Sequence, residues 1–335
     1  MEQLLVGCNN GLARVSLEDG RSEWVFDGPP VPSVAVDPGN PERVYAATLG
    51  KGLWVSNDAG SSFARADGLS ADLVWSVTVS ASDRRSSLGA VYCGTQMSAL
   101  FRSTDGGGSF EELESLHDIP SVPEWSFPPA PDTHHVHQIA LHPEDPGSVV
   151  FGVELGGVYR SRDRGATWTA TNADPDPHTL RTHPQDPDRM YEGGGNAFFE
   201  SRDGGSNWQS FLGGVADELR YFYSLAVDAS DPDTLLISAA RDPFSGHGII
   251  PGIEAWSTMF RREGDGDWQE VTDGLPPREG TPMGTLVAGG PGVFVYVTEP
   301  GEVYRSDDGG RSFQAAGSVE LDPPVKKVRS LAVVA

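Results

Sequence analysis

Cysteine, lysine and long apolar runs are all scarce in this chain of 335 residues. The two cysteines, Cys8 and Cys93, are too few for a disulfide framework, and we expect both to be buried free thiols. No apolar run is long enough to span a bilayer, so we expect no membrane partner. No signal peptide precedes the first expected strand, which favours a cytoplasmic location.

Basic residues are also few. The chain has 48 acidic residues against 24 lysines and arginines, a formal net charge of −24, and its only lysines are Lys51, Lys326 and Lys327. No basic patch is available to displace counterions, so we expect no nucleic-acid partner. An acidic, lysine-poor surface is typical of a salt-adapted (halophilic) cytoplasmic protein, because high salt screens the self-repulsion. An ordinary acidic bacterial protein is the alternative.

What the chain does contain is a repeated octapeptide, Ser-x-Asp-x-Gly-x-Ser/Thr-aromatic. Clean copies occupy Ser56–Phe63, Ser103–Phe110, Ser161–Trp168 and Ser306–Phe313, and Ser201–Trp208 has Asn at the seventh place. Two degenerate copies end at Trp24 and Trp268. Seven copies at a spacing of roughly 40–60 residues indicate one propeller or solenoid rather than seven separate sites.

Each octapeptide lies inside a longer unit that predicts four β-strands. In residues 33–65, an apolar run ends at Asp37-Pro38, Val44–Thr48 and Leu53–Ser56 form two further strands, and the octapeptide turns the chain into a fourth. Four strands per unit is the composition of a propeller blade. We therefore predict an all-β protein, a closed seven-bladed β-propeller with four-stranded antiparallel blades.

The two ends of the chain indicate how the ring closes. Residues 2–27 supply strands two to four of a blade but no first strand, and residues 328–334 match the missing strand. We expect the C-terminal strand to complete the first blade, which makes residues 1–335 one propeller. Closure removes the exposed sheet edges that an open stack of seven sheets, the alternative, would leave.

The octapeptide resembles the Asp-box, or BNR repeat, of sialidases, sortilin-type receptors and related propellers, and the resemblance covers essentially the whole chain. The motif is specific for a turn and unspecific for activity. Its carboxylate and hydroxyl can accept backbone N–H groups that a tight turn leaves unpaired, and its glycine allows a backbone conformation that a side chain would obstruct. We therefore interpret one set of residues as structural: Asp58, Asp105, Asp163, Asp203 and Asp308.

A ligand site is expected on the face opposite the octapeptide turns. The irregular insertions Glu111–Val136 and Arg241–Ser257 occur on that face, where the innermost strands also begin. Aligning the units places at this mouth Pro32, Trp75, His137, His178, Tyr223, Gly284 and Arg329, with Glu154, Asn196, Arg241 and Gln96 in neighbouring loops. The ligand-binding residues that we predict are Trp75, His137, His178, Tyr223, Arg241, Arg329 and Glu154.

Three interpretations of this mouth stay open. His134, His137 and His178, with Glu154, could bind a divalent metal, the one cofactor that the sequence suggests. Arg241 and Arg329 could instead hold an anionic ligand or carbohydrate. The third interpretation is that these groups only solvate the entrance of a channel.

The resemblance also suggests enzyme activity, but sialidase activity is not expected. The Arg-Ile-Pro signature of sialidases is absent, and sialidases usually have six blades. The chain looks closer to the seven-bladed BNR proteins of archaea and actinobacteria, and at the repeat level it resembles photosystem assembly factor propellers, which bind proteins. We predict a monomeric intracellular ligand-binding propeller. A glycosyl hydrolase-like hydrolase or lyase that uses the same mouth is the alternative, and a protein-interaction scaffold is the second alternative.

Overall fold

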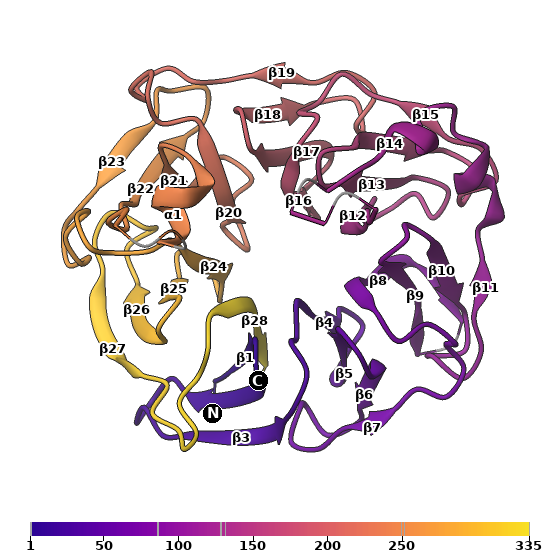
Figure 1. Ribbon diagram of the computed structural model, residues 1–335, viewed down its shortest axis with the longest axis horizontal. Helices are drawn as coiled ribbons and strands as arrows, with labels where there is room; N and C mark the ends of the chain where they lie inside the picture. Colours follow the sequence, from indigo (N-terminus) through magenta and orange to yellow (C-terminus); the bar gives the residue numbers. More distant parts are fainter. Residues whose placement is uncertain are drawn as a thin grey trace.

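The described residues form a ring of seven four-stranded antiparallel sheets around a central channel (Figure 1). The computed structural model describes residues 2–85, 87–127, 129–130, 132–248, 250 and 252–334. In this part of the chain no helix is both long enough and apolar enough to cross a membrane. The predicted fold class, a closed seven-bladed propeller, is confirmed.

The strands follow one another from blade to blade in chain order. The first blade contains β28 (Val328–Val334), β1 (Gln3–Cys8), β2 (Gly11–Ser16) and β3 (Ser22–Asp27). The second contains β4 (Ser33–Asp37), β5 (Asn40–Thr48), β6 (Gly52–Ser56) and β7 (Ala64–Arg65). The third contains β8 (Val74–Arg85), β9 (Leu88–Thr95), β10 (Leu100–Ser103) and β11 (Glu111–Glu112), and the fourth β12 (Val136–Leu141), β13 (Val149–Val153), β14 (Gly157–Ser161) and β15 (Thr169–Ala170).

The last three blades repeat the same order. The fifth contains β16 (Pro177–His183), β17 (Asp186–Gly194), β18 (Phe198–Ser201) and β19 (Gln209–Ser210). The sixth contains β20 (Tyr221–Val227), β21 (Thr234–Ala240), β22 (Thr258–Glu263) and β23 (Gln269–Val271), and the seventh β24 (Gly284–Ala288), β25 (Phe294–Thr298), β26 (Glu302–Ser306) and β27 (Gln314–Ser318). Short helices η1 (Glu114–Asp118), η2 (Val122–Glu124) and α1 (Pro243–His247) lie in the two insertions.

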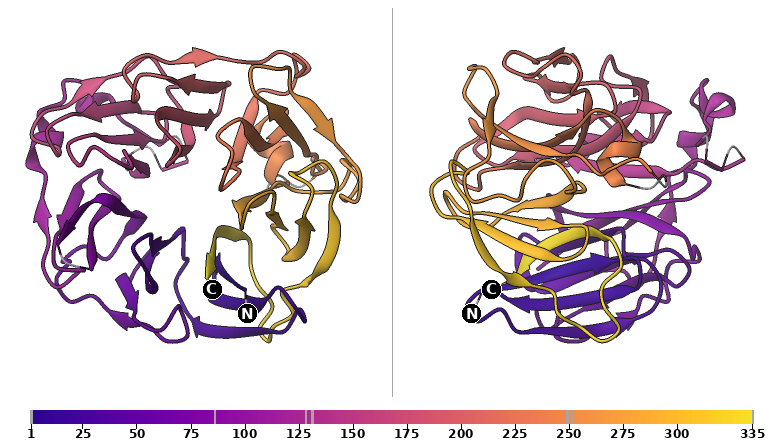
Figure 2. Two further views of the ribbon diagram at one scale, coloured as in Figure 1. Left: turned by 180° about the vertical axis from the view of Figure 1, so that it is seen from behind. Right: turned by 60° about the vertical axis from the view of Figure 1, so that its left-hand side comes forward.

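The chain ends close the ring as predicted. β28 pairs antiparallel with β1, with Gln3 opposite Val334 and Val6 opposite Leu331. Both termini therefore lie in the first blade, side by side in every view (Figure 2). This pairing leaves no blade without its innermost strand, so the ring has no open end at which another chain could add a strand.

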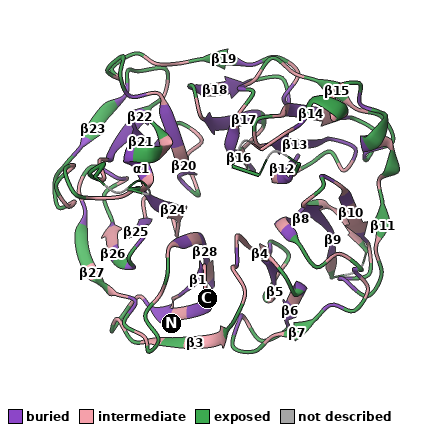
Figure 3. Cartoon of the chain, viewed as in Figure 1, coloured by how far each residue is buried: buried purple, intermediate pink, exposed green. Residues whose placement is uncertain are grey.

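Burial is greatest in the second strand of each blade, partial in innermost strands such as β4 and β28, and lowest at the outer rim (Figure 3). The second strands are almost wholly buried, as in β13 and β21, whereas the two-residue outer strands β7, β11, β15 and β19 are exposed. Apolar side chains of adjacent blades pack face to face, for example Tyr92 of the third blade in one cluster with Phe151 of the fourth. The two cysteines are buried free thiols in second strands, as expected.

Hydrogen bonds between side chains and backbone amides hold the octapeptide turns together. Ser56 Oγ donates to Asp58 Oδ1 at 2.7 Å and accepts the Gly60 amide at 2.8 Å. The Asp58 carboxylate accepts the Ser62 amide at 2.9 Å and the Ser62 hydroxyl at 2.6 Å. Gly60 has φ +80°, a conformation that favours glycine. The same bonds recur at Asp105, Asp163, Asp203 and Asp308.

Candidate functional site

The site lies at the end of the channel where the innermost strands begin and the second strands end. Glu154 follows β13, Asp176 precedes β16, and His247 ends α1 in the connection from β21 to β22. The insertions with η1, η2 and α1 extend toward one face of the ring (Figure 2, right). Since β14 and its counterparts run away from this face, the octapeptide turns lie at the opposite end, as expected.

β-bulges bring five of the predicted ligand residues to the channel. In each case the first strand of the blade carries one more residue than the second strand opposite it, and the predicted ligand residue lies in this bulge. The five residues are Trp75, His137, His178, Tyr223 and Arg329. A bulge redirects a side chain out of the regular alternation and is frequent next to functional sites. The mouth is therefore built from one repeated backbone feature that presents a different side chain in each blade.

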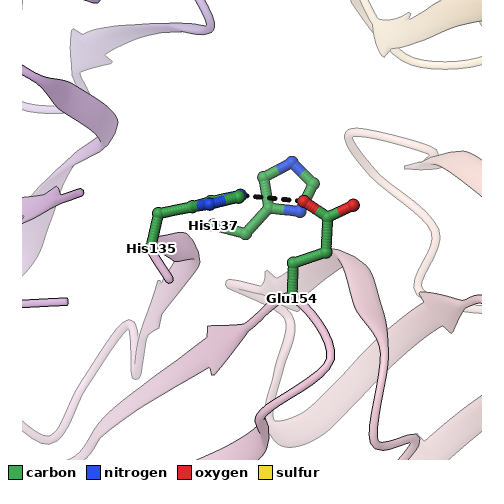
Figure 4. Close-up of side chains that lie close together, drawn as sticks. All are labelled: His135, His137 and Glu154. Atoms are coloured by element: carbon green, nitrogen blue, oxygen red, sulfur yellow. Dashed lines mark hydrogen bonds and ion pairs between the residues drawn. The ribbon is translucent and has the colours of Figure 1, made fainter. Parts of the chain in front are cut away.

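His135 and Glu154 form the centre of the mouth (Figure 4). His135 Nε2 donates to Glu154 Oε2 at 2.8 Å, and the imidazole is buried. The indole of Trp75 stacks on the His135 ring, with centroids 3.8 Å apart and planes at 13°. The stacked ring fixes the orientation of the imidazole, so its Nε2 is held toward the carboxylate.

His137 and His178 also have fixed orientations. His137 Nδ1 lies 3.3 Å from the carbonyl oxygen of Pro177, and His178 Nδ1 lies 2.7 Å from that of Phe222. A carbonyl oxygen can only accept, so each Nδ1 carries a proton. The Nε2 of His137 is left with a free lone pair. Burial alone would lower the pKa of His178, but the neighbouring Asp176 carboxylate raises this pKa and favours a proton on Nε2 as well. Nε2 of His178 lies 3.5 Å from Asp176 Oδ2.

These groups make two overlapping clusters of potential metal ligands. One consists of His135, His137 and Glu154, and the other of Glu154, Asp176 and His178. Within each cluster the ligand atoms all lie within 4.8 Å of one another. Imidazole nitrogens and carboxylate oxygens are suitable ligands for divalent transition metals.

The protonation states suit such a cluster. Burial alone would raise the pKa of Glu154, but the hydrogen bond from His135 and the neighbouring imidazoles of His137 and His178 lower this pKa to about 2. Burial lowers the pKa of His137 to about 4. At neutral pH the mouth therefore holds an ionised carboxylate beside a neutral imidazole.

A second hydrogen-bonded chain borders the first. His247 Nδ1 donates to Glu299 Oε1 at 2.6 Å, and its Nε2 lies 3.1 Å from the Tyr221 hydroxyl. Lys327 Nζ lies 3.0 Å from the same Glu299 oxygen. The Tyr221 ring meets the His178 ring edge to face, with centroids 4.8 Å apart. Because Glu299 fixes the proton of His247 on Nδ1, the Nε2 of His247 accepts a hydrogen bond from the Tyr221 hydroxyl.

Below the mouth, the channel wall is basic. A cavity of about 280 Å³ is lined by His137, His178, Tyr223, Arg181 and Arg329 together with apolar and hydroxyl residues, and none of its described lining residues is Asp or Glu. In a chain with 48 acidic residues this segregation of charge is marked. The channel is thus a positively charged cavity inside a negatively charged protein.

Arg181 is the most informative residue of this wall. Its Nη1 donates to the Leu180 carbonyl at 2.8 Å and to Gln138 Oε1 at 3.5 Å, both uncharged acceptors. Burial lowers its pKa to about 10, so the guanidinium is still charged at neutral pH. Arg181 is partly buried, and a guanidinium that is partly withdrawn from water without a described counter-charge is a candidate binding group for an anion. Arg329 likewise donates to the neutral side chain of Asn9.

Backbone strain is concentrated at the same end of the channel. Outside the octapeptide turns, the described non-glycine residues with positive φ are Met97 (64°), Ser98 (23°), Leu155 (55°) and Lys327 (41°). All four precede a first strand or follow a second strand. Residues in such strained conformations persist only where the surrounding structure holds them, and they are frequent at ligand sites.

Two predicted site residues lie elsewhere. Arg241 is exposed and lies over the Trp256 ring, 4.7 Å from its centroid, and it is not among the described residues that line the channel cavity. His134 lies beside Trp125, with ring centroids 5.8 Å apart, and is absent from both ligand clusters of the described residues. His135, the next residue, occupies the place expected for His134.

The sequence analysis did not identify six side chains of the mouth. These are His135 as a potential metal ligand, Asp176, Arg181, Tyr221, His247 and Glu299. A signal was present for Arg181, which is a charged residue in the innermost strand β16 at the place where other repeats have Ala35, Ala140 and Ala226. A weaker one was present for Asp176, two residues before His178. His247 and Glu299 are 52 residues apart and carried no shared pattern.

A larger groove of about 380 Å³ lies outside the channel, between the sixth and seventh blades, and includes Met259, Pro276 and Tyr296 in its lining. Its basic residue, Arg278, is already paired with Glu270. The groove therefore presents no unneutralised charge comparable with Arg181, and the channel mouth is the better candidate site.

Comparison with known proteins supports the fold and nothing finer. No family model and no curated sequence matches the chain. Among solved structures, a GH74 enzyme of Niastella koreensis has a TM-score of 0.68 at 15% identity, covering 94% of this chain and 52% of that one. An ancestral GH74 enzyme has a TM-score of 0.63 at 17% identity, covering 82% and 36%. A YCF48 structure, bound to a D1 peptide, has a TM-score of 0.60 at 15% identity, covering 91% and 92%. The chain therefore spans only about a third to a half of the two GH74 structures.

Proposed function

We propose that the protein binds an anionic small molecule, with an acidic sugar as the ligand class, at the mouth and inner wall of its channel. The observation that carries this proposal is Arg181, a charged group in a channel wall without a described carboxylate. Arg329 adds a second guanidinium to the same cavity. Guanidinium groups pair with carboxylates and phosphates in a two-pronged geometry, which makes them selective for such ligands.

The distribution of charge makes the channel the favoured place for such a ligand. The net charge of −24 repels anions from the outer surface, whereas inside the channel the lower dielectric constant strengthens the attraction between an anion and the two arginines. The ring of Tyr223 beside the arginines offers an aromatic surface for a sugar ring. Arg241, which the sequence predicts to bind the ligand, is assigned in this proposal to the rim of the site and not to its wall.

Calorimetric titration tests the proposal with glucuronate and glucose 6-phosphate as probes and neutral glucose as the reference. We expect the anionic probes to bind and glucose not to bind, and Arg181→Gln to weaken binding at least about tenfold. Arg220→Gln, at an exposed arginine paired with Asp217, is the matched control and should bind like the unaltered protein. Equal binding of glucose, or an unaffected Arg181→Gln variant, would contradict the proposal.

A hydrolase or lyase that uses the same mouth is the second candidate. The chain Tyr221–His247–Glu299 favours it, because a carboxylate-oriented imidazole beside a hydroxyl is an arrangement for proton transfer. The similarity to GH74 enzymes is compatible with this candidate at the level of the fold. The test is turnover of acidic oligosaccharides by the unaltered protein and by Tyr221→Phe. Turnover lost in Tyr221→Phe at an unchanged Tm supports the candidate, and no turnover by the unaltered protein opposes it.

A protein-interaction scaffold is favoured by a different observation. The exposed large hydrophobic residues of the described chain all belong to loops of the mouth face: Leu73, Met97, Leu155, Phe244, Ile250 and Ile253. An apolar rim of this kind is a feature of protein-binding surfaces. If the scaffold hypothesis holds, Met97→Ser with Leu155→Ser should abolish partner binding while leaving the titrations with anionic probes unchanged. Partner binding unaffected by these two changes would argue against it.

The proposal also includes the repeat type, the cellular location, the salt adaptation and the oligomeric state expected from the sequence. We propose that the octapeptide units are Asp-box (BNR) repeats and that the protein is a cytoplasmic, salt-adapted monomer. The support is the acidic, lysine-poor composition. A rise of Tm between low and molar potassium chloride would support salt adaptation, and a fall would oppose it.

A further inference from the structure

We propose that the channel mouth holds one divalent transition-metal ion, coordinated by His135, His137, Glu154 and His178, with Asp176 next to the ion. This centre differs from the ligand set expected from the sequence, because His135 replaces His134 and a second carboxylate is added. It does not depend on the anionic ligand proposed above, because neither Arg181 nor Arg329 is among its ligands, although His137 and His178 line the same cavity as these arginines.

The first argument is the convergence of the ligand atoms. The two clusters share Glu154, and in each cluster the ligand atoms lie within 4.8 Å of one another. Ligands that bind one ion at about 2.0–2.2 Å lie no more than about 4.4 Å apart. Each cluster can thus close around an ion by small side-chain rotations, and because Glu154 belongs to both clusters, the proposal places a single ion beside this carboxylate.

The second argument is the preset geometry of the imidazoles. The Nδ1 protons of His137 and His178 are donated to the carbonyls of Pro177 and Phe222. Metal-binding histidines characteristically donate their other ring N–H to such a partner, which fixes the ring and increases the basicity of the coordinating nitrogen. The stacked indole of Trp75 holds the His135 ring in place. To coordinate through Nε2, His135 must carry its proton on Nδ1 instead, and the ion then replaces the hydrogen bond between His135 and Glu154.

The third argument identifies the class of metal. Three imidazole nitrogens with one or two carboxylates suit zinc, manganese(II) or iron(II), whereas calcium and magnesium prefer oxygen ligands alone. The thiols of Cys8 and Cys93 are buried inside strands β1 and β9 and belong to neither ligand cluster. The centre is therefore a nitrogen–oxygen site for a borderline divalent ion.

The fourth argument is the place of the centre in the fold. His135, His137 and Glu154 belong to the fourth blade, and Asp176 and His178 belong to the fifth. A bound ion would link two blades that are otherwise joined by packing and a few polar contacts. Because the ion binds the folded ring and not the separated strands, its binding should raise Tm, and Tm should continue to rise with the logarithm of the free-metal concentration.

The experiment is a titration of chelator-treated protein, made without a histidine tag, with zinc and manganese(II), and with iron(II) without oxygen. We expect one ion per chain by calorimetry and a rise of Tm on loading. Glu154→Gln and His135→Gln should each weaken binding at least about tenfold and remove the rise of Tm. His117→Gln, at a half-exposed histidine paired with Glu112, is the matched control and should bind normally.

Two further measurements decide the remaining outcomes. His134→Gln should bind the ion like the unaltered protein; loss of binding in this variant and not in His135→Gln would overturn the ligand assignment. If the variants fail to fold, the absorption spectrum of cobalt(II) on the unaltered protein still tests the centre. We expect visible absorption bands of cobalt(II) coordinated by nitrogen and oxygen ligands. No stoichiometric uptake of any of the four metals would overturn the proposal.

Discussion

Arg262 on β22 and Glu200 on β18, 62 residues apart in the chain, form an ion pair buried between the fifth and sixth blades. The side chains are 1% and 0% exposed, respectively. Glu200 also accepts from Arg189 Nε at 2.9 Å, and Arg189 has a second carboxylate partner in Asp233. Removing the Glu200 carboxylate would leave the buried charge of Arg262 uncompensated between the blades.

We therefore predict that Glu200→Gln lowers the free energy of unfolding by about 3–5 kcal/mol. The matched control is Glu23→Gln, which breaks the exposed pair with Arg14 and should cost no more than about 1 kcal/mol. Denaturant unfolding of both variants measures the difference. Equal losses of unfolding free energy in the two variants would show that the buried ion pair stabilises the fold no more than the exposed one.

Glu192 is a buried carboxyl group without a compensating charge. Both of its oxygens lack a hydrogen-bond partner in the described structure, and the side chain is fully buried. Burial, followed by the nearby charges of Asp174 and Asp176, raises its pKa well above the usual value. An acid with a raised folded-state pKa binds a proton that the unfolded chain releases, so its contribution to stability falls as pH rises above about 4.5.

From this we predict that Glu192→Gln raises Tm at pH 7, by about 2–4 °C for each kcal/mol gained, and that the gain shrinks as pH falls toward 4. Calorimetric scans of both proteins between pH 4 and pH 8 provide the measurement. A gain that does not depend on pH would mean that Glu192 does not titrate in this range.

The octapeptide aspartates should make the fold sensitive to acid. The hydrogen bonds from Ser62 and Ser56 lower the pKa of Asp58 to about 2, and the pKa of Asp105 is also lowered to about 2 by those from Ser109. A lowered folded-state pKa gives stability that is present above about pH 4 and is lost as pH falls toward 2. We predict a steep fall of Tm across this window and a shallower fall in Asp58→Asn. Asp67→Asn, at an exposed aspartate outside the octapeptides, should keep the steep profile.

The glycines of the octapeptide turns should be intolerant of substitution. Gly310 has φ +79°, and a Cβ there would lie 2.6 Å from Leu236 Cδ1 of the neighbouring blade. Gly310→Ala should cost about 2–5 kcal/mol, the sum of backbone strain and overpacking. Gly264 also has a positive φ, +58°, but a Cβ at that position would have nothing within 4 Å, so Gly264→Ala should cost only about 1–2 kcal/mol. Denaturant unfolding of the pair separates strain from overpacking, and similar costs would contradict the role of Leu236.

The sequence by itself determined the architecture. The spacing of the octapeptides set the number of blades, and Ser330–Val334 at one end with the incomplete unit at the other set the closure. Both signals are local, because a tight turn needs its own serine, aspartate and glycine, and a buried strand needs its own apolar run. The alignment of units also placed Trp75, His137, His178, Tyr223 and Arg329 at one equivalent position per blade.

Only the tertiary structure decided which side chains meet. His135, and not His134, forms an isolated bridge with Gln96 and meets Glu154, and Arg241 lies in the insertion after β21 over the Trp256 ring. The sequence displays neither placement. The chain from His247 to Glu299 joins an insertion of the sixth blade to a loop of the seventh. Contacts between blades depend on how rigid units are arranged around the ring, and no short-range pattern encodes that arrangement.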